Sequence, residues 1–308
     1  MAPLSPQSSR DSLLGLVSAA SAFSVWGLLP IYWKFLLPVP ALEIITHRVV
    51  WSVVFLLILI GLSRHLPDLL AAFRNRRALG ALSVSTILLA ANWLIYIWAV
   101  NSDHVLQASL GYYINPLVNV LLGMIFLQER LRRLQAAAVL LAAAGVLILT
   151  VHYGQLPWIA LTIAFSFGIY GLIRKVAPVG SVEGLTVETL LLTIPGLIYL
   201  IYLEKTGNGS FLHSGLQIDL LLIGTGPITA VPLLLFTAGA RRIPLSTVGL
   251  LQYIAPSGMF LLAVFIYREP FTAAQVWTFV MIWTALGIYS ADLIRHYRRY
   301  HVNTSQAP

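Results

Sequence analysis

Ten long apolar stretches dominate the 308-residue sequence and restrict the folds open to it. A helix that crosses the hydrocarbon core of a bilayer needs about 20 mostly apolar residues. Backbone groups in that core must find their hydrogen-bond partners within the protein, so each stretch is predicted to be a membrane-spanning α-helix. The predicted spans are residues 12–33, 42–62, 78–100, 104–127, 134–151, 157–174, 183–203, 217–239, 245–267 and 273–294.

The composition excludes several classes of protein. Hydrophobic residues make up 58% of the chain and charged residues only 10%, which is too apolar for an ordinary soluble domain or a disordered chain. The chain has no cysteine, so thiol catalysis, disulfides and thiolate metal sites are absent. It also lacks HExxH, GxSxG and P-loop motifs, and its seven histidines show no metal-ligand spacing. We therefore predict no enzyme, no ATP-driven pump, no cofactor and no bound metal.

The positive charges predict the orientation of the chain. Fifteen of its 19 lysines and arginines fall at the N-terminal end, in one alternate set of connections or in the C-terminal tail, whereas the other connections hold only Lys34, Lys205 and Arg268. Cytoplasmic loops of membrane proteins are enriched in lysine and arginine, so both termini are predicted to be cytoplasmic. The formal net charge of +8 then reflects topology, and no nucleic-acid partner is predicted. The charged segment Leu66–Arg77 is predicted to be a short interfacial helix on the same side.

The two halves of the chain resemble each other at an offset of 140 residues. Both copies carry Tyr-Ile-x-Pro, at residues 113–116 and 253–256, and a glutamate follows each proline after thirteen residues. Each half holds five spans, and because five is odd the second half enters the membrane upside down. Inverted repeats of this kind are typical of secondary transporters whose substrate site lies between the halves. We predict a first repeat at residues 1–151, a second at 152–294 and a cytoplasmic tail at 295–308.

Four further motifs resemble the RarD subgroup of the EamA-type drug/metabolite transporters, and the resemblance covers nearly the whole chain. The motifs are Val25-Trp26-Gly27-Leu28, Thr46-His47-Arg48-Val49-Val50-Trp51-Ser52, Ser109-Leu110-Gly111-Tyr112-Tyr113-Ile114-Asn115-Pro116 and Tyr170-Gly171-Leu172-Ile173-Arg174-Lys175. The resemblance implies a ten-helix, two-repeat carrier in the bacterial inner membrane that moves small organic molecules, often outward. Members of the subgroup are commonly labelled for chloramphenicol sensitivity, which does not supply a substrate.

Two charged residues inside spans are candidates for function. Arg48 lies about 9 Å below the outer membrane edge, where a charge is costly unless it faces a cavity or a partner. It is predicted to bind the polar or anionic part of a substrate, to anchor helix ends through Glu43, Asp103 or Glu269, or to extend its charged group outward to the membrane surface. Glu188 occupies the equivalent position in the second repeat. It lies roughly 13 Å deeper than Arg48 in a core about 30 Å thick, so we expect it to pair with Arg174 or Lys175 instead.

Other residues predict the lining of a cavity. Span four places Ala108, Gly111, Tyr112, Asn115 and Asn119 on one helical face. His47 could couple protons to transport or serve only as a hydrogen-bonding residue. Pro116 and Pro256 interrupt helical hydrogen bonding at matched positions, and each is predicted to kink its helix. The candidate substrate-binding or gating residues are Arg48, His47, Trp26, Asn92, Trp93, Tyr96, Tyr112, Tyr113, Asn115, Pro116, Asn119, Tyr170, Arg174, Glu188, Gln252, Tyr253 and Pro256.

These patterns together predict an all-α membrane protein of ten helices in two inverted five-helix repeats. The predicted function is secondary transport of small organic metabolites or drugs by alternating access, in the direction of export. Its partners would be a small-molecule substrate, the lipid bilayer and, if transport is coupled, protons. The alternative that remains open is a passive channel or facilitator without ion coupling.

Overall fold

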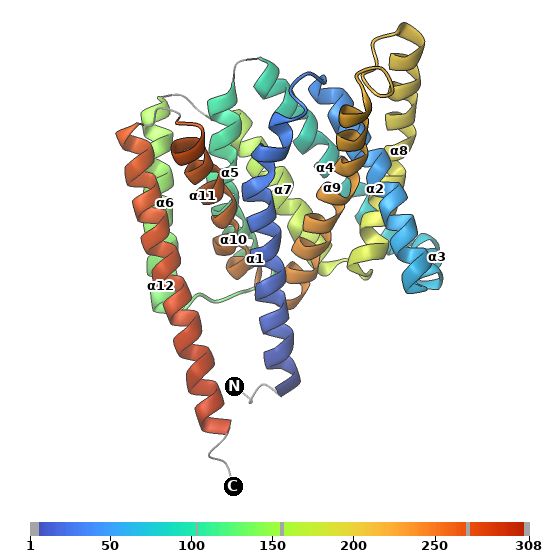
Figure 1. The fold of residues 1–308 in the computed structure, drawn as a ribbon. Coiled ribbons are helices and arrows are strands. Elements are labelled where there is room, and N and C mark those ends of the chain that lie inside the picture. The colour runs from blue at the N-terminus through green and yellow to red at the C-terminus, as the bar shows by residue number, and fades with distance from the viewer. Residues whose placement is uncertain (1–5, 103, 155–156, 269–271, 305–308) are drawn as a thin grey trace.

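The computed structural model describes residues 6–102, 104–154, 157–268 and 272–304, and within these ranges the chain is helical with no strand. Figure 1 shows a bundle of long helices with both termini at the same end. The helices are α1 (Pro6–Lys34), α2 (Ala41–Ser63), α3 (Leu66–Arg74), α4 (Arg76–Asn101), α5 (Val105–Phe126), α6 (Arg133–Tyr153), α7 (Trp158–Val176), α8 (Ser181–Thr206), α9 (Leu216–Arg242), α10 (Leu245–Gln252), α11 (Ile254–Leu261), the π-helical segment η1 (Leu262–Ile266) and α12 (Ala273–Thr304).

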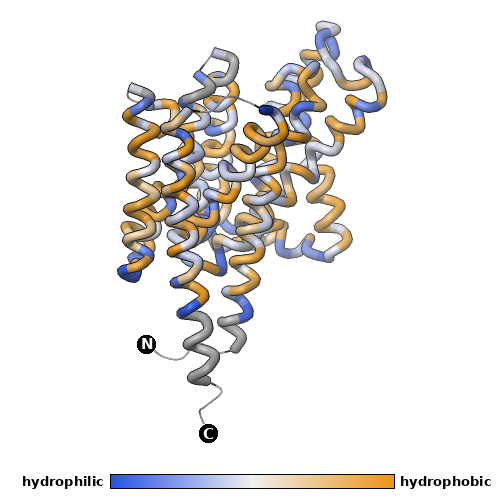
Figure 2. Tube along the Cα trace, turned by 60° about the vertical axis from the view of Figure 1, so that its left-hand side comes forward, coloured by the Kyte–Doolittle hydropathy of each residue, from blue (hydrophilic) through white to orange (hydrophobic). Residues whose placement is uncertain are grey.

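Ten of the described segments are long and apolar enough to cross a membrane, which confirms the predicted spans. Figure 2 shows hydrophobic residues along the lengths of the helices and hydrophilic residues at their ends. The short helix α3 forms where an interfacial helix was predicted, and Asn75 caps the next helix by accepting hydrogen bonds from the backbone of Arg77 and Ala78 at 3.1 Å.

The last two spans agree with their predicted bounds, and the structure adds two features to them. Helix α12 continues to Thr304, so most of the predicted tail at 295–308 extends the last span as a helix. No glycine or proline occurs between Gly287 and Pro308 to end it. The ninth span is three consecutive pieces, α10, α11 and η1, with a turn at Tyr253.

The prolines at matched positions have different outcomes. Pro116 lies inside the continuous helix α5, whereas the second repeat breaks at Tyr253, three residues before Pro256. Pro256 has no amide hydrogen to donate to the carbonyl of Gln252, which lies at the end of α10. The helix interruption near the matched prolines therefore occurs in the second repeat.

The helix contacts follow the predicted inverted repeat. Helix α1 packs on α9 as α7 packs on α4, and α2 packs on α9 as α8 packs on α4. Helix α5 packs on α7 as α11 packs on α1. The remaining large contacts join equivalent elements, namely α2 with α8, α5 with α10, and α6 with α12. Each of these large contacts thus either has a symmetric counterpart or joins equivalent elements, as expected of two interlocked inverted halves.

Glycines allow the closest crossings between the halves. A Cβ atom added at Gly226 in α9 would lie 2.7 Å from the Cβ of Trp51 in α2, so only glycine fits there. Gly27 in α1 similarly faces Gly258 in α11, whose Cα lies 3.4 Å from the position of such a Cβ. Close backbone approach at small residues is the usual way in which membrane helices pack tightly. These crossings hold α1, α2, α9 and α11 around the middle of the bundle.

Candidate functional site

A cavity of about 400 Å³ lies between the two repeats. We call the end of the bundle with both termini and α3 the terminal side, and the opposite end the distal side (Figure 1). The cavity reaches the distal side, because its lining includes Lys34 and Leu37, which are both exposed at the distal end of α1. Its lining residues are Phe23, Trp26, Leu29, Pro30, Trp33, Lys34, Leu37, Ile45, Arg48, Asn92, Trp93, Tyr96, Gly111, Tyr112, Asn115, Ile163, Phe167, Thr229, Leu233, Gln252, Ala255, Pro256 and Met259.

The structure brings together nine of the predicted site residues at this cavity and places the other eight elsewhere. The nine are Trp26, Arg48, Asn92, Trp93, Tyr96, Tyr112, Asn115, Gln252 and Pro256. The eight outside the lining are His47, Tyr113, Pro116, Asn119, Tyr170, Arg174, Glu188 and Tyr253. None of the described side chains of α6, α8 and α12 belongs to the lining, which comes from the inner helices of both repeats.

Arg48 is held at the cavity wall by neutral partners. Its Nε donates a hydrogen bond to Oγ1 of Thr229 at 3.0 Å. The guanidinium carbon lies 5.1 Å from the ring centre of Trp33 and 4.7 Å from that of Trp93, within cation–π range of both. Among the described residues, no carboxylate forms an ion pair with it, and Glu43 instead binds the loop after α8. Asp103 and Glu269 lie outside the described residues.

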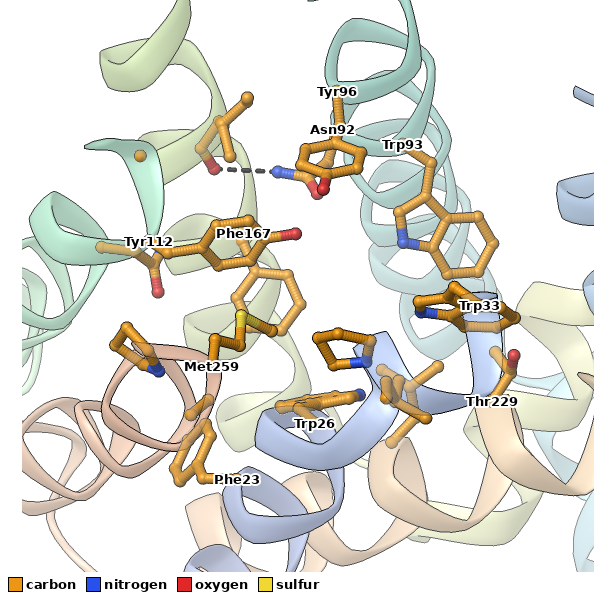
Figure 3. A pocket seen from close by; sticks show the side chains of 18 of the residues that line it. Phe23, Trp26, Trp33, Asn92, Trp93, Tyr96, Tyr112, Phe167, Thr229 and Met259 are labelled. Atoms are coloured by element: carbon orange, nitrogen blue, oxygen red, sulfur yellow. Dashed lines mark hydrogen bonds between the residues drawn. The ribbon is translucent and has the colours of Figure 1, made fainter. Parts of the chain in front are cut away.

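Aromatic side chains form most of the remaining wall. Figure 3 shows Trp33 and Trp93 on one side of the cavity and Tyr112, Phe167 and Met259 on the other. At the deep end Trp26 contacts Phe167 with ring centres 5.8 Å apart. Phe236 lies beyond them, 5.3 Å from Phe167. The rings of this group close the cavity toward the terminal side.

Amide side chains form a second layer beneath the cavity. Gln252 donates to Oδ1 of Asn115, and its own Oε1 accepts from Nδ2 of Asn119 at 2.7 Å. Asn115 also donates to the carbonyl of Ala164 in α7 at 2.5 Å. The network joins α5, α7 and α10, so the polar stripe predicted on span four serves as both cavity lining and interhelical contact.

A buried ion pair lies closer to the terminal side. Arg174 and Glu188 are fully buried, with Nε 3.6 Å from Oε1. Ser85 donates to the same carboxylate, and the hydroxyl of Tyr170 donates to it at 3.4 Å. Arg174 also donates to the carbonyl of Ser181 at 3.1 Å. The structure thus pairs Glu188 with Arg174, one of the two partners expected for it, and the pair does not touch the cavity.

Three charged residues that the candidate set omitted connect helix ends on the terminal side. Lys175 of α7 donates to the carbonyls of Ala240 and Ile243, at 2.6 and 2.5 Å, at the end of α9. Arg241 of α9 donates in return to the carbonyl of Ala177 at 2.8 Å. These cross-contacts satisfy carbonyls that a helix leaves without partners at its C-terminus.

Glu129 is the third residue. Its carboxylate accepts hydrogen bonds from the backbone of Leu245 and Ser246, at 2.6 and 2.9 Å, and from the Ser246 hydroxyl at 2.7 Å. It therefore caps the N-terminus of α10, whose N-cap residue Pro244 provides no side-chain hydrogen bond. The sequence signal for this contact is the glutamate thirteen residues after each matched proline.

His47 lies outside the cavity in a distal cluster. Nε1 of Trp51 donates to its Nδ1 at 3.2 Å, and its ring centre lies 5.0 Å from that of Phe211, with the two rings tilted by 46°. Glu43, one turn earlier, accepts from the backbone and hydroxyl of Ser210 at 2.7 and 3.0 Å and so holds the loop after α8. Nε2 of His47 also lies 3.9 Å from the Glu43 carboxylate, so both roles predicted for His47, hydrogen bonding and proton coupling, stay predictions.

Glu183 is the counterpart of Glu43, 140 residues later. It lies 3.0 Å from Nδ1 of His65, in the connection after α2. Together with Asp68 these are the one group of three described side chains whose metal-ligating atoms lie within 4.8 Å of one another. His65 already contacts both carboxylates, at 3.0 and 3.1 Å, so the group is explained as an ion-pair cluster on the terminal side.

The remaining predicted residues pack in the core. The hydroxyl of Tyr253 donates to the carbonyl of Tyr113 at 3.2 Å, which joins the two copies of the Tyr-Ile-x-Pro motif. Both tyrosines pack against α6 or α12. The tyrosines of the repeat motif thus mark a contact between the two repeats, whereas Asn115, Ala255 and Pro256 of the same motif line the cavity.

Comparison with known proteins identifies the family. The model of the EamA-like transporter family matches residues 13–151 and again residues 157–291, which are the two repeats. An uncharacterized transporter of Vibrio cholerae serotype O1 is 50% identical over 92% of this chain and 94% of its own length. Protein RarD of Escherichia coli K12 is 46% identical over 94% of this chain and 98% of its own length.

Two further similar proteins also match this chain over nearly its whole length. A chloramphenicol-sensitive protein RarD of Pseudomonas aeruginosa is 33% identical over 94% of this chain and 99% of its own length. A crystal structure with 20% sequence identity has a TM-score of 0.69 and covers 93% of this chain and 98% of that one, a likeness of fold. The chain therefore belongs to the EamA-like transporter family, among its RarD-type members, and is a membrane transporter.

Proposed function

We propose that this protein is a secondary carrier that moves small organic metabolites or drugs out of the cytoplasm by alternating access. One observation carries the proposal. The cavity between the inverted repeats reaches the distal side, while aromatic, amide and ionic layers fill the path to the terminal side. A continuous pore would not need such layers, whereas a carrier must close one side while the other is open.

The proposal includes an orientation in the bacterial inner membrane with both termini cytoplasmic. The excess of lysine and arginine on the terminal side supports this orientation. The distal side then faces outward, and the structure corresponds to the outward-open state. Exchange of the roles of the two repeats would close the distal side and open the terminal side.

Arg48 and Glu188 are proposed to belong to opposite gates. Arg48 lies at the distal cavity and Glu188 in the layer that closes the terminal side. Each environment would form and break once per cycle. Neutralising either residue should therefore reduce the transport measured per molecule of folded protein. Normal flux in both Arg48→Gln and Glu188→Gln proteins would rule out this part of the proposal.

The experiment begins with purified protein in a thermal-shift screen against amino acids, nucleosides and drugs, with chloramphenicol included because a relative's name refers to it. A ligand that binds the folded state raises its apparent stability. For each ligand found, uptake of the labelled compound into proteoliposomes is then measured. The proteoliposomes either contain the unlabelled compound or are empty.

A carrier gives saturable uptake that unlabelled compound on the opposite side accelerates. A passive channel gives uptake proportional to concentration and without that acceleration, which would favour the alternative function. Repeating the assay with an imposed proton gradient tests coupling. Arg242→Gln serves as the control variant, because Arg242 is exposed and, among the described residues, its side chain bonds only to the carbonyl of Ala238 in its own helix.

A further inference from the structure

We propose that the cavity selects small organic monoanions, in which a carboxylate is attached to a flat apolar or aromatic body, and that Arg48 binds the carboxylate. This inference rests on the proposed function, since it names the substrate class of the same cavity. It makes Arg48 a specificity-determining residue and excludes organic cations and amino-acid zwitterions as preferred substrates.

The first argument is the charge of the lining. The described lining residues include two cations, Lys34 and Arg48, and no aspartate or glutamate. Lys34 lies at the distal mouth, with Nζ 3.0 Å from the ring centre of Tyr267. A cleft lined by one sign of charge with apolar walls concentrates ions of the opposite sign. The lining therefore favours anions over cations along the path from the mouth to Arg48.

The second argument is the state of Arg48. A guanidinium group has five N–H donors in a fixed fork that matches a carboxylate. The structure engages Nε with Thr229 and places the group near the rings of Trp33 and Trp93. These neutral partners orient the cation without neutralising it. A bound carboxylate would supply the opposite charge that no described residue supplies.

The third argument concerns what the cavity offers to an ammonium group. The amide oxygen of Asn115 already accepts from Gln252, and the amide oxygen of Gln252 accepts from Asn119. Asn92 donates from its nitrogen to the carbonyl of Ile163 and the hydroxyl of Ser166, at 2.8 and 2.9 Å, and would offer an ammonium group only its neutral amide oxygen. The faces of Trp33 and Trp93 already lie against Arg48. A zwitterion would bring its ammonium group into a cavity that has no carboxylate to receive it.

The fourth argument is size and shape. A volume of about 400 Å³ is at the small end of the range for ligand sites and fits one small molecule. The walls opposite and below the two tryptophans are the rings of Trp26, Tyr112 and Phe167 (Figure 3). Aromatic rings pack favourably against such walls in offset or edge-on arrangements. A ring-sized apolar body therefore suits the part of the cavity away from Arg48.

The test measures binding in detergent, so it does not depend on transport. Phenylacetate, phenylacetamide, phenethylamine and phenylalanine serve as anionic, neutral, cationic and zwitterionic probes with a shared ring. Binding is followed by quenching of tryptophan fluorescence, because Trp26, Trp33 and Trp93 line the cavity. We expect phenylacetate to bind about tenfold or more tightly than each other probe, as a charge-assisted hydrogen bond to Arg48 predicts.

Variants locate the preference. Arg48→Gln should abolish the difference between phenylacetate and phenylacetamide, and Arg48→Lys should retain part of it. Lys34→Gln should weaken phenylacetate binding by a smaller factor. Arg242→Gln should bind like the parent protein. Circular dichroism and gel filtration confirm that each variant is folded before its affinity is compared.

Three results of the binding experiments would overturn the proposal. The first is that phenylacetate fails to bind at millimolar concentration or binds no better than its amide, amine or amino-acid counterpart. The second is that Arg48→Gln leaves the preference unchanged. The third is that Asp103→Asn or Glu269→Gln raises phenylacetate affinity, which would mean that a carboxylate of the protein neutralises Arg48. In transport assays, saturable, trans-accelerated transport of a zwitterion or cation would overturn the substrate class and leave the carrier function intact. Non-saturable flux of an anion would overturn the carrier function and leave the substrate class intact.

Discussion

The pair formed by Arg174 and Glu188 illustrates how charged side chains are tolerated inside the membrane. Removing both groups from water is expensive, and their mutual attraction offsets this cost only when the remaining hydrogen bonds are made. Ser85 and Tyr170 provide donors to the carboxylate, and the carbonyl of Ser181 accepts from the guanidinium. The pair therefore connects α4, α7 and α8, and loss of either charge would disrupt the contacts among all three helices.

Breaking this pair from one side should destabilise the protein strongly. Arg174→Gln leaves the carboxylate of Glu188 buried without its counter-charge, and we expect a loss of about 3–5 kcal/mol in unfolding free energy. Glu188→Gln likewise leaves the guanidinium group of Arg174 buried without its counter-charge. The double variant should lose less than the sum of the two single variants, because neither charge remains. Thermal unfolding in detergent measures all three, and strictly additive losses would show that the two groups act independently.

At the scale of helices, the same contact occurs twice in inverted form. Glu43 at the start of α2 holds the loop that follows α8, and Glu183 at the start of α8 contacts His65 in the connection that follows α2. The turns after α5 and η1 also match, since Gln128 and Arg268 both have left-handed backbone, with φ of 53° and 54°. The repeat thus preserves the contacts that attach connections to helix ends as well as the helices themselves.

The cap that Glu129 places on α10 is the terminal-side contact best suited to a test. Gly123 leaves room for it, because a Cβ atom there would lie 2.6 Å from Oε2 of Glu129. Glu129→Ala removes a carboxylate that accepts three hydrogen bonds, so we expect a loss of about 1.5–3 kcal/mol. Amide hydrogens of Leu245 and Ser246 should exchange faster with solvent deuterium.

Glu204→Gln is the matched control for that experiment. Glu204 is an exposed glutamate at the opposite end of the bundle, where it pairs with His213 at 3.1 Å, and surface pairs of this kind contribute little. Its substitution should leave exchange at residues 243–250 unchanged. Unaltered exchange at Leu245 and Ser246 in Glu129→Ala would mean that the cap does not stabilise the start of α10.

For the molecule as a whole, the sequence predicts the helices better than the cavity. Hydropathy and the 140-residue offset are properties of whole segments, so the ten spans and the two repeats could be predicted from them. Which face of a helix meets the cavity depends on packing between distant segments. Asn115 and Asn119 share one face of α5, yet only Asn115 lines the cavity, because Asn119 is covered by Gln252 from the other repeat.

The residues missed by the sequence have the same explanation. Trp33, Phe167 and Thr229 look like ordinary apolar or small helix residues, and only the crossing of α1, α7 and α9 brings them to one cavity. Glu188 and Tyr170 are residue types that are expected in a binding site, but both lie in the layer below the cavity. Polar residues in a span indicate that some partner exists, and the three-dimensional packing decides which one.

The direction in which the cavity opens can be tested by labelling single cysteine substitutions in intact spheroplasts, because the parent chain contains no cysteine that would also react. Met259→Cys lies in the cavity lining, and His213→Cys lies on the distal side. Both should react with a membrane-impermeant maleimide added to intact spheroplasts, since the distal side is proposed to face outward. Arg130→Cys and Arg242→Cys are exposed on the terminal side and should react only after the membrane is permeabilised.

Each pattern of labelling has a definite meaning. Reaction of Arg130→Cys and Arg242→Cys from different sides would contradict the inverted arrangement of the repeats, since the two positions are proposed to face the cytoplasm together. Reaction of His213→Cys but not Met259→Cys in intact spheroplasts would show that the cavity is closed to the outside under those conditions. Labelling of Met259→Cys should also slow when phenylacetate is present, because the proposed ligand occupies the same 400 Å³ as the reagent, and a probe that binds elsewhere would leave the rate unchanged.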